Sequence, residues 1–316
     1  KYDSISCLYN EGYNRSRLNS FVDKVNERKL DIRDGGVEKL VTSLTILNIV
    51  ESDTDLNLMF ANAIYSGSSA EIVYLFNDKG KVESVEDAVW IGASPELLFK
   101  KYHDSECYEA LALAGTMPAD SKESWSDKNI EEHNLVINHF KHEEVVCSAS
   151  TEKSYSTYKV QDVFPTREVR YGSIKHLATD IRVKFDGTQM ELINIIHPTP
   201  AVCGFPKPNS KIIIRKDHCK DDLYAGVIAI NEPNGDFFSF VNLRCFKAAS
   251  FENDLKDAGK YLHFRVGAGI VADSDAYEEM HEVVSKYKTV RDLFGIIEDE
   301  ALDNCADLLA RHTSSI

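Results

Sequence analysis

Hydrophobic and polar positions follow helical spacing in several parts of this chain. Between Asp127 and Cys147 the spacing of the apolar residues predicts a long amphipathic helix; they are Ile130, Leu135, Val136, Phe140 and Val145. The same reasoning predicts helices at 56–64, 191–197 and 275–297, and another that closes the chain. These helices are separated by stretches with a different pattern.

Those stretches are rich in branched and aromatic residues and predict β-strands. They are the segments 71–76, 87–93, 97–102, 224–230, 236–246 and 262–271. Predicted strands and helices are grouped along the chain and do not alternate as βαβ units. This grouping favours an α+β fold over a doubly wound parallel sheet.

One segment, "IIHPTPAVCGFPKP" at 195–208, holds four of the eight prolines of the chain. Proline fixes φ and lacks a backbone donor, so the segment cannot be a helix interior or a central strand. It also lacks the polar residues of a solvated linker. We therefore expect a stiff, apolar loop whose backbone lies close to a ligand.

Composition narrows the class of protein. The 316 residues are 43% hydrophobic and 28% charged, which is ordinary for a soluble globular chain, and no run of about 18 apolar residues predicts a membrane span. The start of the chain has no secretory pattern. A net charge of −15 argues against nucleic acid or an anionic membrane as partner. Seven scattered cysteines without a CxxC pair favour reduced thiols and a cytoplasmic location.

Charged residues in two predicted helices are candidate ligands. Glu279, Glu282 and Lys286 share one helix face, and Glu132 lies near the start of the helix at 127–147. A solvated helix face explains each group as well as a site does. Two glutamates from separate helices could together hold Mg²⁺, which takes one or two carboxylates plus waters and substrate oxygens.

Other candidates lie in apolar surroundings. Lys39 stands in "GGVEKLVTSLT", Glu96 directly follows a predicted strand, and Arg244 stands in "FSFVNLRCF". A buried cation needs an anionic partner, whereas a lone glutamate after a strand is usually exposed. The glycines in "RVGAGIV" do not form the GxGxxG pattern of a dinucleotide site; they allow close approach of a ligand or of another strand.

Ten short segments, in order, resemble the chorismate-utilising enzymes and, among these, the isochorismate synthases. They are "VEKLVTS" (37–43), "GASPELLF" (92–99), "LAGT" (113–116), "SDKNIEEH" (126–133), "HLAT" (176–179), "HPTPAVCGFP" (197–206), "YAG" (224–226), "LRC" (243–245), "GAGIV" (267–271) and "EEMHEVVSKY" (278–287). The resemblance covers residues 37–290. It implies an α+β fold of large, mostly antiparallel sheets with helices outside and a deep central cleft. A helical region at 1–36 would precede a catalytic domain at 37–316.

The resemblance also implies a reaction: Mg²⁺-dependent conversion of chorismate to isochorismate, in which water attacks C2 and the C4 hydroxyl leaves. Lys39 would be the general base and Glu96 the general acid. A lysine base must be neutral and a glutamic acid donor protonated, and burial favours both forms. Mg²⁺ would be held by Glu132 and Glu282, with Glu279 acting through a water. Substrate would be bound by His176, Thr199, Ala201, Tyr224, Arg244, Gly267, Gly269 and Lys286.

Alternatives stay open within this resemblance. The chain could be a salicylate synthase, an anthranilate or aminodeoxychorismate synthase, or a non-catalytic chorismate-binding relative. Lys39 favours water over ammonia as nucleophile, so no glutaminase subunit is expected. Leu44, Asn129 and Asp221 depart from the family pattern. The resemblance leaves open whether the product would serve menaquinone or a catechol siderophore.

Overall fold

The chain divides by its internal contacts into two compact units. Unit 1 comprises residues 1–94 and 243–316, and unit 2 comprises residues 95–242. The computed structural model describes residues 5–6, 8–9, 11–66, 70–78, 88–142, 145–147, 155–171, 174–217, 223–252 and 258–297. The expected boundary between residues 36 and 37 stays a prediction.

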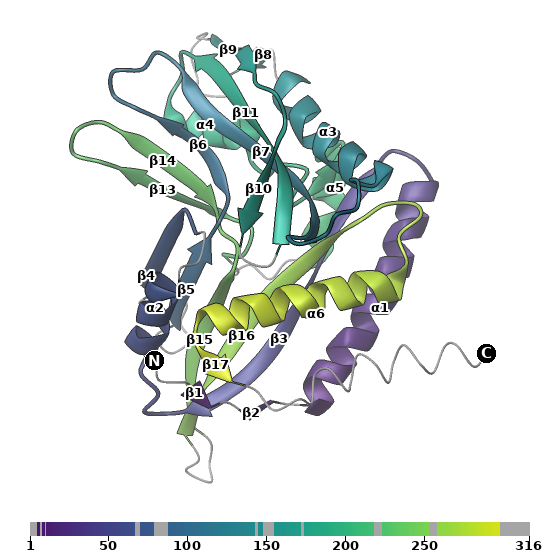
Figure 1. Ribbon diagram of the computed structural model, residues 1–316, viewed down its shortest axis with the longest axis vertical. Coiled ribbons are helices and arrows are strands. Elements are labelled where there is room, and N and C mark those ends of the chain that lie inside the picture. The colour runs from purple at the N-terminus through teal and green to yellow at the C-terminus, as the bar shows by residue number, and fades with distance from the viewer. Residues whose placement is uncertain are drawn as a thin grey trace. The chain divides into compact units, whose positions relative to one another are not determined.

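Unit 1 is built on an antiparallel sheet (Figure 1). Its strands follow the order β3–β16–β15–β5–β4, and β2 pairs with β3. A short parallel pair, β1 with β17, lies apart from this sheet. The strands are β1 (Ile5–Ser6), β2 (Leu8–Tyr9), β3 (Lys39–Glu51), β4 (Ile72–Asp78), β5 (Ala88–Ser94), β15 (Cys245–Glu252), β16 (Ala258–Ile270) and β17 (Ile296–Ile297).

Three helices accompany this sheet: α1 (Glu11–Arg33), α2 (Leu56–Tyr65) and α6 (Ala276–Leu293). Helices α1 and α6 pack against β3 and β16, as Figure 1 shows. Each buries apolar residues at helical spacing. In α1 these are Leu18, Phe21, Val22 and Val25, and in α6 they are Met280, Val283, Val284 and Tyr287.

Hydrogen bonds in the core fasten both helices to β3. The buried Asn14 side chain of α1 bonds both the N–H and the carbonyl of Leu47, each at 2.9 Å. The buried Tyr287 hydroxyl of α6 donates to Asn48 Oδ1 at 2.7 Å. These bonds satisfy polar groups that burial would otherwise leave unpaired.

Unit 2 contains a second, mostly antiparallel sheet in the order β13–β14–β6–β7–β11–β9–β8, with β10 also paired to β11. Its strands are β6 (Leu97–Lys101), β7 (Tyr108–Pro118), β8 (Val145–Cys147), β9 (Tyr155–Val163), β10 (Arg167–Tyr171), β11 (Ile174–Phe185), β13 (Val227–Asn231) and β14 (Phe237–Val241). The short β12 (Gly204–Phe205) also lies in unit 2. Its helices are α3 (Asp127–His142), α4 (Gln189–Ile196) and α5 (Lys207–Ile214), which continues as a 3₁₀ turn at Arg215–Asp217.

Helix α3 packs on β7 and β11. His133 Nε2 lies 2.8 Å from Thr179 Oγ1 on β11, and His139 Nε2 donates to the carbonyl of Ile196 at 2.7 Å. Both histidines are buried. Helix α3 is therefore tied to the sheet at one point and to the end of α4 at another.

The α+β fold with antiparallel sheets is confirmed, but some predicted bounds are wrong. The helix expected to reach residue 147 ends at His142, and the β-branched pair Val145–Val146 begins β8 instead. The strand expected at 236–246 is two strands, β14 and β15, separated by residues 242–244. The helix expected to reach residue 297 ends at Leu293, and Gly295 follows at a positive φ of 71°. The helix expected to close the chain lies outside the described residues.

The described helices and cysteines bear on two expectations from the sequence, one about membrane spans and one about the redox state of the thiols. Within the described part of the chain, every helix is too short or too polar to cross a membrane. Cys107, Cys203 and Cys245 are free thiols. The remaining four cysteines lie outside the side chains that the structure describes.

Candidate active site

The thirteen predicted site residues are divided between the two units. Unit 1 carries seven of them: Lys39, Arg244, Gly267, Gly269, Glu279, Glu282 and Lys286. Unit 2 carries the other six: Glu96, Glu132, His176, Thr199, Ala201 and Tyr224.

In unit 1 the site residues gather at one end of the sheet. Leu40 pairs with Ile270 in the antiparallel β3–β16 ladder, so Lys39 at the start of β3 lies at the same end as Gly267 and Gly269 on β16. The Lys39 side chain is 1% exposed, and Lys39 is among the largest fully buried residues of the chain. A buried lysine at the end of a strand is an unusual feature that packing alone does not require.

Arg244 lies just before β15 at the same end, because Phe246 pairs with Phe264 three residues before Gly267. Its φ of 48° is in the left-handed region, which a non-glycine residue seldom adopts. The Arg244 carbonyl accepts a hydrogen bond from the Ala93 N–H at 3.0 Å. The expectation that Arg244 lies inside a continuous strand is therefore wrong, since a positive φ interrupts the strand.

Lys286 joins α6 to this end of β16. Its ammonium donates to the Gly267 carbonyl at 3.0 Å and pairs with Glu282 Oε1 at 2.7 Å. The two side chains of the ion pair are 36% and 40% exposed. Lys286 thus connects Glu282 to Gly267. The atom of Gly267 that contacts the ammonium is its carbonyl oxygen.

Glu279 lies one turn before Glu282 on α6 and is 2% exposed. Its Oε1 accepts a hydrogen bond from the Ser274 hydroxyl at 2.7 Å. Ser274 was not predicted; its only signal in the sequence is its place just before a helix start. Among the described residues, no three His, Cys, Asp or Glu side chains are grouped as metal ligands. Two carboxylates at i and i+3 nevertheless suit Mg²⁺, which completes its shell with water or substrate oxygens.

In unit 2, Glu96 lies between Pro95 and the first residue of β6 and is 7% exposed. Its carbonyl accepts a hydrogen bond from the Val241 N–H at 3.0 Å, which holds the backbone of Glu96 against the end of β14. A glutamate so placed is mostly removed from water, unlike the exposed glutamate that usually follows a strand.

Tyr224 lies in a tight turn that Asn242 holds in place. The Ala225 N–H donates to the Asn242 carbonyl and the Asn242 N–H donates to the Gly226 carbonyl, both at 2.8 Å. The Asn242 side chain donates to the Leu223 carbonyl at 2.7 Å. Ala225 has a φ of 58°, so the turn is strained next to Tyr224. Asn242 was also missed; a polar residue between Val241 and Leu243 was its only signal.

His176 on β11 contacts the Gly115–Thr116 segment of β7. Its Nδ1 lies 2.8 Å from the Gly115 carbonyl and 3.2 Å from Thr116 Oγ1. Because a carbonyl only accepts, Nδ1 carries the proton that fixes the ring. The Thr116 N–H in turn faces Asn129 Oδ1 of α3 at 3.4 Å, and the half-buried Glu132 follows on that helix.

The loop at 197–203 closes on Thr199. The Thr199 carbonyl accepts from the N–H groups of Val202 and Cys203, at 3.1 and 3.0 Å. Thr199 is 3% exposed, and within the described residues its hydroxyl has no hydrogen-bond partner. Ala201 is half-buried. The predicted segment 195–208 is neither a helix interior nor a central strand: it holds the end of α4, this loop, the edge strand β12 and the first turn of α5 with Pro208.

Comparison with known proteins identifies the family. The model of the chorismate binding enzyme family matches residues 14–292, which is most of the chain. This protein therefore belongs to the chorismate binding enzymes. The family resemblance seen in the sequence is confirmed.

Individual relatives are more distant. The chain is 27% identical to isochorismate synthase EntC of Escherichia coli over 82% of this chain and 63% of EntC, so it spans less than two thirds of that protein. It is 26% identical to anthranilate synthase component 1 of Neisseria meningitidis, over 63% of this chain and 40% of that one. The solved structure of MenF, the menaquinone-specific isochorismate synthase of Escherichia coli, matches with a TM-score of 0.69 at 19% identity, covering 93% of this chain and 65% of MenF.

Proposed function

We propose that this protein is an isochorismate synthase, which converts chorismate to isochorismate. The observation that carries the proposal is the burial of two side chains of opposite function, Lys39 at 1% and Glu96 at 7% exposure, on a chain of this family. Exchange of one hydroxyl for another on the substrate ring needs one group that accepts a proton and one that donates a proton. The similarity to EntC supports the same choice.

In the proposed reaction, Lys39 accepts a proton from water as the water oxygen bonds to C2 of the ring. Glu96 donates a proton to the C4 hydroxyl, which leaves as water while the ring double bond shifts. One water is consumed and one is released, so the reaction is an isomerisation. A neutral amine and a protonated carboxyl are the forms required at the start.

The remaining polar residues bind the two carboxylates of the substrate. Arg244, Tyr224 and Lys286 supply donors to them, and the backbone amides around Gly267 and Gly269 supply more. His176 contributes its Nε2 as an acceptor, because Nδ1 carries the proton that meets Gly115. Thr199 and Ala201 are small enough to leave room for the ring.

We further propose Mg²⁺ as the cofactor, held by Glu132 and Glu282 with Glu279 acting through a water. The carboxylate donors suit this ion. When bound, Mg²⁺ neutralises a substrate carboxylate and draws electron density from the ring. Glu282 now pairs with Lys286, so it would exchange this cation for the metal, whereas Glu279 would stay oriented by Ser274.

The direct test is incubation of the purified protein with chorismate, with and without Mg²⁺, followed by separation of the products by liquid chromatography. We expect isochorismate that depends on Mg²⁺ and disappears on chelation. Lys39→Ala and Glu96→Gln should each lower turnover by about a thousandfold, in line with the loss of a proton-transfer group. Glu38→Gln is the control, because Glu38 is exposed beside Lys39.

The similarity to anthranilate synthase component 1 favours a second candidate, an ammonia-using enzyme. The same assay with added ammonium salt separates the two, since anthranilate or aminodeoxychorismate would then form. Salicylate with pyruvate would identify a salicylate synthase. Chorismate that binds without turnover would identify a non-catalytic relative. Full activity of Lys39→Ala or of Glu96→Gln would refute the proton-transfer roles.

A further inference from the structure

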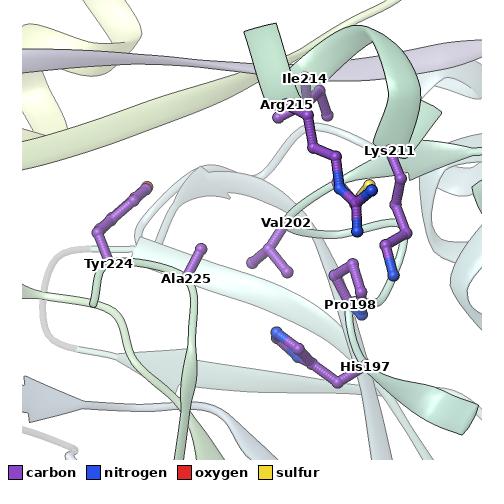
Figure 2. A pocket seen from close by; sticks show the side chains of 9 residues that line it. His197, Pro198, Val202, Lys211, Ile214, Arg215, Tyr224 and Ala225 are labelled. Carbon is purple, nitrogen blue, oxygen red and sulfur yellow. The ribbon is translucent and has the colours of Figure 1, made fainter. Parts of the chain in front are cut away.

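Unit 2 contains a pocket of about 170 Å³ beside helix α5 (Figure 2). Its walls come from the loop at 197–203, from α5 with its 3₁₀ turn, and from the turn that carries Tyr224. The described lining residues are His197, Pro198, Val202, Cys203, Lys211, Ile214, Arg215, Tyr224 and Ala225. Only Tyr224 among them belongs to the proposed substrate-binding set.

Two cations project into this pocket together. Lys211 and Arg215 are four residues apart, and Figure 2 shows both side chains extending from the helix toward Pro198. Lys211 is partly buried and Arg215 is exposed. Like charges at this spacing repel each other on a helix. A bound anion would offset this repulsion.

Among the described lining residues, none is acidic. They include no Asp or Glu, although the chain has 51 of them. Among the described residues, the side chains of Lys211 and Arg215 make no ion pair or hydrogen bond; the Arg215 backbone N–H donates to the carbonyls of Ile213 and Lys211. In a chain with a net charge of −15, two cations that share a pocket with no carboxylate among its described lining residues are unusual.

Two other lining groups, His197 and Cys203, are uncharged at neutral pH. Burial, together with repulsion from Lys207 and Lys211, lowers the pKa of His197 to about 4. Burial raises the pKa of the Cys203 thiol to about 11. The Nδ1 atom of His197 is buried and has no hydrogen-bond partner among the described residues. Among the described lining residues, the charge thus comes from Lys211 and Arg215.

We propose that this pocket binds a small oxyanion, either a phosphate group or a compact dicarboxylate. A doubly charged oxyanion matches the two cations, and Arg215 offers the forked donors that phosphate and carboxylate accept. The proline-rich loop supplies a preformed wall, so little ordering is needed on binding. This site goes beyond the proposed reaction, because Lys39 and Glu96 take no part in it.

The negative end of the α5 dipole is a weaker explanation for the cations. A helix dipole favours positive charge near the last turn, and this accounts for basic residues there. It does not require that both side chains point into one pocket. Nor does it account for the absence of a carboxylate from the nine lining residues.

Calorimetric titration at low ionic strength tests the proposal, with sodium phosphate and sodium malonate as separate probes. We expect saturable binding of one equivalent of at least one probe. Tighter binding of phosphate would identify a phosphoryl ligand, and tighter binding of malonate a dicarboxylate. Lys211→Gln and Arg215→Gln should each weaken binding by about tenfold or more, as expected for a lost charge-assisted hydrogen bond.

Lys216→Gln is the matched control, because Lys216 is exposed next to Arg215 but does not line the pocket. When the titration is repeated at about 0.15 M salt, where exposed charges are screened beyond about 8 Å, its Kd should stay within about twofold of the original protein. Equal weakening by Lys216→Gln would reduce the effect to general surface charge and overturn the proposal. Absence of saturable binding of both probes would do the same. A rise in Tm with either probe should vanish in the Lys211→Gln/Arg215→Gln double variant, and its persistence there would also count against the site.

Discussion

Among the described residues other than glycine, Arg244 and Ala225 have a positive φ. Arg244 is itself a proposed substrate-binding residue, and Ala225 directly follows another, Tyr224. A non-glycine residue in the left-handed region costs about 1–2 kcal/mol. Each is held by a backbone hydrogen bond, to Ala93 in one case and to Asn242 in the other. Local strain of this kind concentrates where side chains must point in a fixed direction.

Asn242 is the residue whose loss should release the turn around Tyr224. Asn242→Ala removes the side-chain donor of a part-buried hydrogen bond to the Leu223 carbonyl, so the free energy of unfolding should fall by about 0.5–1.5 kcal/mol. If Tyr224 binds a substrate carboxylate, KM for chorismate should rise more than kcat falls. Urea denaturation and steady-state kinetics measure the two effects.

The exposed Asn231 at the end of β13 provides a control for this change. Asn231→Ala should leave both the urea midpoint and KM near their original values. If Asn242→Ala lowers stability but changes kcat and KM no more than this control does, the turn is a structural feature only and does not position Tyr224.

At the scale of elements, the start of α6 is set by its N-cap. The Asp275 carboxylate accepts from the N–H groups of Tyr277 and Glu278, at 2.9 and 3.0 Å. Asp275→Ala should lower the free energy of unfolding by about 1 kcal/mol, the usual value for a lost cap. Thermal denaturation measures the loss. Asp273→Ala is the control, because Asp273 is exposed just outside the helix; an equal loss in both variants would contradict the cap as the cause.

Elements with one dominant local cause were predictable from the sequence. Helix α6 begins at Ala276, one residue from the predicted start, because both the cap and the apolar spacing are local. The break at 242–244 was not predictable. The apolar residues Val241 and Leu243 suit a strand that continues as well as a chain that passes from one sheet to another. The strand ends here because Asn242 bonds to Leu223, Ala225 and Gly226, which only the folded chain brings near.

In the candidate site, too, residues marked by a local motif were predictable and residues that act through distant partners were not. Its residues were found through short motifs that match the family. The supporting groups Ser274, Asn242 and Thr116 were not found, because each acts through a partner that only the folded chain brings near. The cations Lys211 and Arg215 were missed for a related reason: nothing in their sequence indicates that they share a pocket.

At the scale of the whole molecule, buried histidines couple stability to pH. Burial lowers the pKa of His139 and of His197 to about 4, from an ordinary value near 6.5. Protons then bind the unfolded chain more tightly, so both groups stabilise the fold above pH 6.5 and this contribution falls as pH drops toward 4. We expect a loss of about 2 kcal/mol per histidine between pH 7 and pH 5, measured by urea denaturation.

His139→Gln tests the assignment. Glutamine keeps a donor for the Ile196 carbonyl but does not titrate, so the loss between pH 7 and pH 5 should shrink by about 2 kcal/mol. The exposed His103 offers a contrast. Its Nδ1 lies 2.9 Å from Asp236 Oδ1, and this hydrogen bond raises the pKa of His103, so its contribution to stability is lost as pH rises instead of as pH falls. An unchanged pH dependence in His139→Gln would show that the acid sensitivity arises elsewhere.

The division of unit 1 into two separate segments has a consequence for synthesis of the chain. Leu40 pairs with Ile270, so β3 waits for a partner that is made 230 residues later. Residues 95–242 are continuous and emerge complete in between, which takes on the order of 10 s at ribosomal rates. Throughout that interval the edge of β3 that later joins β16 is open to any passing strand. Unit 2 can finish folding on the ribosome, whereas unit 1 depends on protection from aggregation until its last strands appear.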